Sequence, residues 1–108
     1  MAERFISSCP PPEGLERELL TILIEECAEV QQRATKALRF GLEEVQPGQP
    51  LDNKARLSRE VGDFLETVLR AEQIGVLDND EMTAGAENKE KQLNRYLQNQ
   101  EPDMEAAP

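Results

Sequence analysis

Residues 19–30 read LLTILIEECAEV, an aliphatic run that carries three glutamates in its second half. Ile22, Leu23 and Val30 recur at the spacing of one helix face, and Glu26 falls between them on that face. A solvated acidic face would lie opposite the apolar stripe, so a glutamate inside the stripe is informative. This stretch therefore predicts a helix that carries a carboxylate on its packing side, with Glu29 at the stripe's edge and Glu25 just beyond it.

A second acidic pair, Glu60 and Asp63, accompanies another apolar stripe. That stripe consists of Leu57, Val61, Phe64, Leu65 and Val68, whereas the first helix contributes Leu15, Leu19, Ile22, Leu23, Val30 and Ala37. If the two helices pack together, their acids converge, and carboxylates gathered away from water repel one another unless a cation neutralises them. Either acidic pattern alone is common on exposed helices. Their conjunction predicts a site for a hard divalent cation.

The chain is predicted to be all-α, with helices at 13–40, 54–74 and about 79–98. Gly41 and Gly75 supply stop signals, and Asp52 or Asn53 and then Asp78 or Asn79 supply caps. No alternating strand pattern and no internal repeat interrupts this reading. The predicted organisation is an irregular arm at 1–12, a helical domain at 13–99 and a disordered tail at 100–108.

The composition limits both the core and the partners. Only three Phe and one Tyr, and no Trp, occur among the 108 residues, so the core must be small and aliphatic, which favours a homo-oligomer that shares helices. A formal net charge of −10 argues against nucleic acid and anionic membranes as partners. An acidic protein still binds a nucleotide when cations mediate the contact.

The residue types that are missing narrow the chemistry. Histidine is absent, which removes His-dependent nucleophiles, His-containing zinc sites and the usual di-iron bundles. The remaining oxygen ligands favour Mg²⁺, Mn²⁺ or Ca²⁺. Two cysteines, Cys9 and Cys27, suggest no disulfide framework, and no signal peptide or membrane span is recognisable, so a cytoplasmic location is expected.

Two cations follow the first acidic cluster on nearly the same helix face. Arg33 and Lys36 lie one and two turns beyond Glu29, where phosphates bridging from a bound metal would reach them. The alternative is ordinary pairing along the helix, such as Glu29 with Arg33. For Lys36 the two interpretations stay open.

The acidic pattern resembles that of the MazG-like all-α nucleoside triphosphate pyrophosphohydrolases. The resemblance rests on Glu25-Glu26-x-x-Glu29 and Glu60-x-x-Asp63 together with the phrases IEECAEV (24–30), KALRFG (36–41) and SREVGDF (58–64). It covers roughly Leu15 to Ile74 and continues faintly into residues 91–95. It implies helices that assemble as homodimers or homotetramers into four-helix-bundle-like cores. It also implies Mg²⁺-dependent cleavage of a (d)NTP to the monophosphate and pyrophosphate, with Mn²⁺ as a substitute.

The same resemblance implies roles for individual residues. Glu26, Glu29, Glu60 and Asp63 would be the metal ligands, and Glu25 would be the base that activates water or a further ligand. Substrate contacts would come from Lys36 and, less specifically, from Lys91, Asn94 and Arg95. The aromatic residues outside the N-terminal arm, Phe40, Phe64 and Tyr96, serve either as packing residues or as a base-stacking surface.

Two other functions compete with this one. Phosphoribosyl-ATP pyrophosphohydrolase has a similar acidic pattern and would share the chemistry but not the substrate. A non-catalytic helical interaction module would bind no metal and would release no pyrophosphate.

Overall fold

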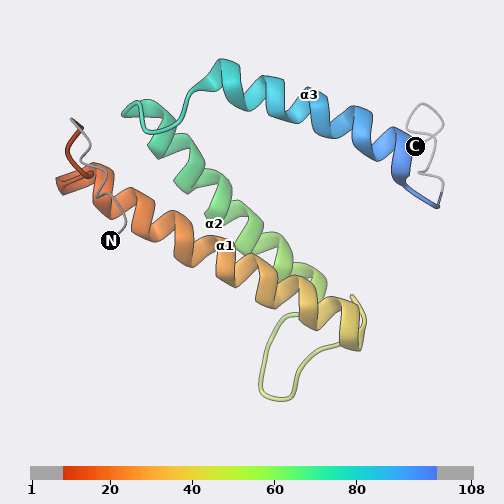
Figure 1. Ribbon diagram of the computed structural model, residues 1–108. Helices are drawn as coiled ribbons and strands as arrows, with labels where there is room; N and C mark the ends of the chain where they lie inside the picture. Colours follow the sequence, from red (N-terminus) through yellow and green to blue (C-terminus); the bar gives the residue numbers. More distant parts are fainter. Residues whose placement is uncertain (1–8, 100–108) are drawn as a thin grey trace, which may run out of the picture. The chain divides into compact units, whose positions relative to one another are not determined.

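The computed structural model describes residues 9–99, and within them it contains three α-helices and no strand (Figure 1). The helices are α1 (Gly14–Phe40), α2 (Asn53–Gln73) and α3 (Asn79–Tyr96). The all-α prediction is confirmed. The predicted tail and residues 1–8 of the predicted arm lie outside the described residues, and residues 9–12 of the arm form no helix or strand. Residues up to Leu77 form one compact unit with α1 and α2, and the residues from Asp78 form a second unit with α3. None of the described helices has the length and apolar character needed to cross a membrane.

The helix boundaries follow the predicted caps and stops. The side chain of Asp52 accepts a hydrogen bond from the Ala55 N–H at 2.8 Å, and Asp78 does the same for Glu81 at 2.9 Å. Gly41, directly after α1, has a φ of 98°, a conformation that is strained for any residue with a Cβ. These local signals need no tertiary contact, which explains why they could be read from the sequence.

α1 and α2 lie side by side as an antiparallel hairpin (Figure 1). The apolar residues along their seam are mostly half-buried, and Ala37 and Ala71 are the buried hydrophobic residues of the described chain. Two small residues at the seam allow a close approach of the two helices. However, two helices cover only a narrow strip of each other, so this core is small.

Two residues of the apolar stripes are exposed in the single chain. Leu65 is 58% exposed and Leu15 is 55% exposed, so the α1–α2 hairpin alone does not bury them. Leu65 lies on the flank of α2 that α1 does not cover. Leu15 lies in the first turn of α1, which has 27 residues against 21 in α2, and the hairpin aligns the helices at their loop ends.

The loop between α1 and α2 closes on a buried asparagine. Asn53 is only 3% exposed, and its side-chain amide donates to the Gly41 carbonyl at 2.9 Å and to the Glu44 carboxylate at 3.2 Å. The backbone N–H of Asn53 donates to the Glu44 carbonyl at 2.9 Å. The end of α1, the loop and the start of α2 are thereby joined through one side chain, which sets the register of the hairpin.

α3 has a different character. It contains no buried residue, and its only half-buried apolar side chain is Met82. Acidic residues in its first turn and Arg95 in its last turn suit the helix dipole.

Replacing Asn53 with Ala should lower the free energy of unfolding by about 1–3 kcal/mol, because the substitution leaves buried backbone and loop groups without their partner. Urea unfolding followed by circular dichroism, at fixed protein concentration, measures the change. Gln49→Ala is the control, since Gln49 is an exposed residue of the same loop. Equal stability of the two variants would contradict a role for Asn53 in closing the hairpin.

Candidate metal centre

Three carboxylates from two helices converge on the seam of the hairpin. Glu26 comes from α1, and Glu60 and Asp63 come from α2. One carboxylate oxygen of each lies within 4.8 Å of the corresponding oxygens of the other two. Because α1 and α2 run antiparallel, acids separated by more than thirty residues in the sequence meet on one face. Oxygen atoms within this distance of one another could coordinate the same cation.

The two central acids are partly withdrawn from water. Glu26 and Glu60 are half-buried, whereas Asp63, Glu29 and Glu25 are exposed. The helical projection that placed Glu26 inside the apolar stripe and Glu25 outside it is therefore confirmed. Glu26 Oε2 and Glu60 Oε2 are each enclosed by protein atoms, and neither has a hydrogen-bond partner while both carboxyl groups are ionised. An enclosed carboxylate oxygen without a donor is costly, and a cation is the group that would satisfy both.

Within the cluster, the pKa of Glu60 is shifted by its surroundings. Partial burial raises the pKa of Glu60 above its ordinary value of 4.5. A side-chain hydrogen bond with Glu26, and then the negative charges of Glu26, Asp63 and Glu29, raise this pKa further. A hydrogen bond between two carboxyl groups exists only while one of them is protonated. Without a cation the cluster therefore holds either a shared proton or uncompensated negative charge, and a divalent cation would displace the proton or neutralise the charge.

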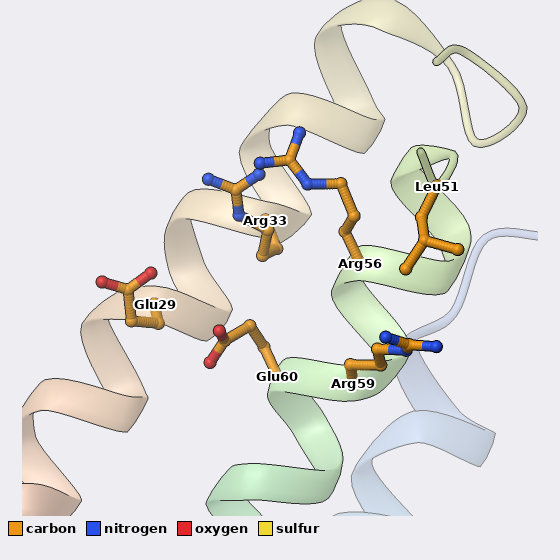
Figure 2. Close-up of a pocket in the computed structure, with 6 residues that line it drawn as sticks. All are labelled: Glu29, Arg33, Leu51, Arg56, Arg59 and Glu60. Atoms are coloured by element: carbon orange, nitrogen blue, oxygen red, sulfur yellow. The ribbon is translucent and has the colours of Figure 1, made fainter. Parts of the chain in front are cut away.

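A cavity of about 290 Å³ opens beside this cluster (Figure 2). Its lining residues are Glu29, Arg33, Leu51, Arg56, Arg59 and Glu60. Figure 2 shows the Glu60 carboxylate extending from α2 toward α1, and the Glu29 carboxylate on α1 directed away from it. Glu29 is thus associated with the cluster through this cavity, although it is not one of the three acids that approach most closely.

Glu25 and Lys36 take different positions from the central acids. Glu25 is exposed on α1, one residue before Glu26. Lys36 is half-buried, and its Nζ lies 5.9 Å from the centroid of the Phe40 ring. Lys36 and Phe40 line a neighbouring cavity of about 230 Å³ with Glu44, Gln46 and Pro47. Phe40 here supports a cation and has 45% of its surface exposed, so it is not a core residue.

The three remaining predicted substrate contacts lie in the second unit. Lys91, Asn94 and Arg95 are all exposed on α3. Asn94 lines a shallow cavity within that unit, and the Arg95 guanidinium lies 5.4 Å from the centroid of the Tyr96 ring. Their assignment as substrate contacts stays a prediction.

Sequence reasoning missed Arg56 and Arg59 as lining residues. Both precede the acids on α2, whereas Arg33 follows the acids on α1. In an antiparallel hairpin these opposite directions coincide, so Arg33 and Arg56 lie at the same end of the acidic cluster, while the Arg59 side chain is directed away from them (Figure 2). The available signal was this mirrored order of charges, which becomes visible only when the two helices are aligned head to tail.

Comparison with known proteins yields no match: no protein-family model, no curated protein and no solved structure matches this chain.

Without divalent cations, Glu60→Gln should make the protein more stable at neutral pH. The substitution removes a charge from a crowded cluster, and the new amide donates to Glu26. In the wild type, the free energy of unfolding should depend on pH through the protonation of Glu60. Because folding raises the pKa of Glu60, the folded state holds this proton more tightly, and the associated stability is full below pH 4.5 and lost as the pH rises through the raised value.

Thermal unfolding in chelator at several pH values, compared with added Mg²⁺ or Mn²⁺, measures both effects. The wild type should gain stability from the cation near pH 7, and Glu60→Gln should gain much less. Glu18→Gln is the matched control, because it removes the same charge from an exposed site on α1. A cation response of Glu60→Gln as large as that of Glu18→Gln would contradict a metal centre here.

Proposed function

We propose that this chain is a Mg²⁺-dependent nucleoside triphosphate pyrophosphohydrolase that cleaves a (d)NTP to the (d)NMP and pyrophosphate. The observation that carries the proposal is the convergence of Glu26, Glu60 and Asp63, with two enclosed carboxylate oxygens that lack partners. The resemblance of the acidic pattern to the MazG-like family adds the reaction type. Glu29, on the wall of the adjoining cavity, completes the proposed set of ligands.

The donor set fits the proposed ion. All four ligands are carboxylates, two of them half-buried and two exposed, so the site offers hard oxygen atoms on one side and access for water and substrate on the other. When bound, a divalent ion supplies charge neutralisation on phosphoryl oxygens and lowers the pKa of coordinated water. The chain's own carboxylates hold that ion and limit its position to the seam of the hairpin.

Glu25 is proposed to accept the proton of the attacking water. Its exposed carboxylate lies next in sequence to the ligand Glu26, so it remains in contact with solvent while its neighbour is withdrawn. In the reaction, the water oxygen forms a bond to the α-phosphorus. The bond from that phosphorus to the oxygen bridging to the β-phosphate breaks, and pyrophosphate leaves with the electron pair.

The proposal includes assembly into a homodimer or homotetramer with a four-helix-bundle-like core. Large apolar side chains that the hairpin leaves uncovered support it: Ile24 is 71% exposed, Leu38 is 89% exposed, and Leu65 and Leu69 share one flank of α2 at 58% and 45%. A monomer rarely leaves this much aliphatic surface in water, and a second hairpin would cover it.

Pyrophosphate release should occur from at least one of the eight common NTPs and dNTPs with Mg²⁺ and should stop with chelator. Replacing any one of the four proposed ligands should reduce the rate by at least about 100-fold; the variants are Glu26→Gln, Glu29→Gln, Glu60→Gln and Asp63→Asn. Loss of a residue that merely supports a metal ligand already costs up to about 100-fold in activity, and loss of the ligand itself should cost no less. Glu25→Gln should reduce it by about 100- to 10,000-fold, as for loss of a general base.

Glu18→Gln and Glu66→Gln are the controls, since both remove exposed acids away from the cluster. Phosphoribosyl-ATP belongs in the same substrate panel. If it alone is cleaved, the enzyme has the proposed reaction type but acts on phosphoribosyl-ATP instead of a (d)NTP. No release from any of these substrates would leave the non-catalytic interaction module as the better account. Full activity in any two of the four ligand variants would overturn the assignment of the site.

Light scattering on the purified protein should give the mass of a dimer or a tetramer, and Leu65→Glu should shift it toward the monomer by placing a charge in the shared core. Asn88→Glu adds the same charge at an exposed polar position of α3 and should leave the mass unchanged. A monomeric wild type at micromolar concentration would refute the shared core.

A further inference from the structure

Three arginines gather in the cavity beside the acidic cluster, which is unexpected in a chain with a net charge of −10. Arg33 comes from α1, and Arg56 and Arg59 come from α2 (Figure 2). Among the described residues, the one ion pair joins Arg70 to Glu66 on the surface of α2. The three cavity arginines are therefore not neutralised by direct pairing with a carboxylate of this part of the chain.

The side chains of Arg33 and Arg56 are held by the surrounding protein. Arg33 is half-buried, and its Nη1 is enclosed by protein atoms with no hydrogen-bond acceptor. Arg56 is half-buried as well, and its Nη1 donates to Gln46 Oε1 of the loop at 2.9 Å. Figure 2 shows the two side chains reaching toward each other across the seam of the hairpin. Two guanidinium groups brought together without an acid repel each other, and an anion with several oxygen atoms would satisfy both.

The cavity has two chemically different ends. Glu29 and Glu60 line one part and belong to the proposed metal centre, while Arg33 and Arg56 line the other. Guanidinium groups bind phosphate oxygens through paired N–H donors, in a geometry that an ammonium does not provide. A volume of about 290 Å³ lies at the lower limit for small-molecule pockets, which suits a short phosphate chain rather than a whole nucleotide.

We infer that Arg33 and Arg56 form a subsite for the terminal phosphates of the substrate, and hence for the pyrophosphate product. This inference rests on the proposed function and deepens it, because it orients the substrate along the seam. The β- and γ-phosphates lie at the arginine end, and the α-phosphorus lies at the carboxylate end. When the bond to the α-phosphorus breaks, the negative charge that develops on the leaving pyrophosphate is met by the two guanidinium groups.

The subsite also gives the loop a role. The hydrogen bond from Arg56 to Gln46 connects the subsite to the loop that Asn53 closes. Gln46 also lines the adjacent cavity that contains Lys36 and Phe40. The loop thus positions Arg56 without contacting the phosphates itself.

Binding of inorganic pyrophosphate to the full chain tests the inference apart from catalysis. Isothermal titration with Mg²⁺ present should show binding to the wild type and at least tenfold weaker binding to Arg33→Gln and to Arg56→Gln. Arg33→Lys keeps the charge but loses the paired donors, so it should also weaken binding while preserving the fold. Arg17→Gln removes an exposed arginine of α1 and should bind like the wild type. Circular dichroism verifies that the variants remain helical.

The outcomes separate this inference from the proposed function. Arginine-dependent pyrophosphate binding by a protein that cleaves no nucleotide would support the subsite and overturn the hydrolase. Nucleotide cleavage with unchanged pyrophosphate affinity in Arg33→Gln and Arg56→Gln would support the hydrolase and overturn the subsite. Absence of pyrophosphate binding to the wild type at millimolar concentration would also overturn the subsite.

Discussion

The mutual repulsion of the carboxylates on the α1–α2 seam is the constraint around which this protein is organised. Glu26, Glu60 and Asp63 approach within 4.8 Å in a hairpin whose buried hydrophobic residues are two alanines. A core this small has little free energy to offset crowded negative charge, because the aliphatic side chains around the acids are only half-buried. Burial first, and then the neighbouring carboxyl groups, raise the pKa of Glu60, in the direction that such crowding produces. Cation binding would relieve the repulsion by neutralising charge, and the proposed assembly with another hairpin would offset it by enlarging the core.

Because α1 and α2 are antiparallel, the seam between them has acidic residues at one end and arginines at the other. On α1 the order along the chain is acid and then arginine, and on α2 it is arginine and then acid. Pairing the helices head to tail places acid beside acid and arginine beside arginine. Asn53 holds the loop end of the hairpin and so sets the register on which this alignment depends. A shift of one helical turn would instead pair Glu60 with Arg33 and would give a conventional salt bridge in place of two unsatisfied groups.

The sequence predicts the parts of this structure that depend on local interactions. Helix ends at Gly41, Asp52 and Asp78 arise from backbone conformation and capping, and the half-buried position of Glu26 arises from helical periodicity. Leu65 shows the limit of such reasoning, because periodicity identifies an apolar face but not how much of it one partner helix covers. The arginine end of the cavity was missed for a related reason. It depends on the register between two helices joined by a twelve-residue loop, and no local pattern determines that register.

The joint presence of enclosed acidic oxygens and an enclosed guanidinium nitrogen bears on the competing functions. A helical interaction module would have no use for Glu26 Oε2, Glu60 Oε2 and Arg33 Nη1, since leaving such groups unpaired costs stability and exposes nothing to a partner. A site for a cation alone would account for the two oxygens but not for the nitrogen. A metal-bound phosphate chain would satisfy all three, because the metal meets the carboxylates and the phosphate oxygens meet the guanidinium. These unpaired groups are therefore what supports the proposal of a metal–polyphosphate ligand, the substrate form that a nucleoside triphosphate hydrolase would require.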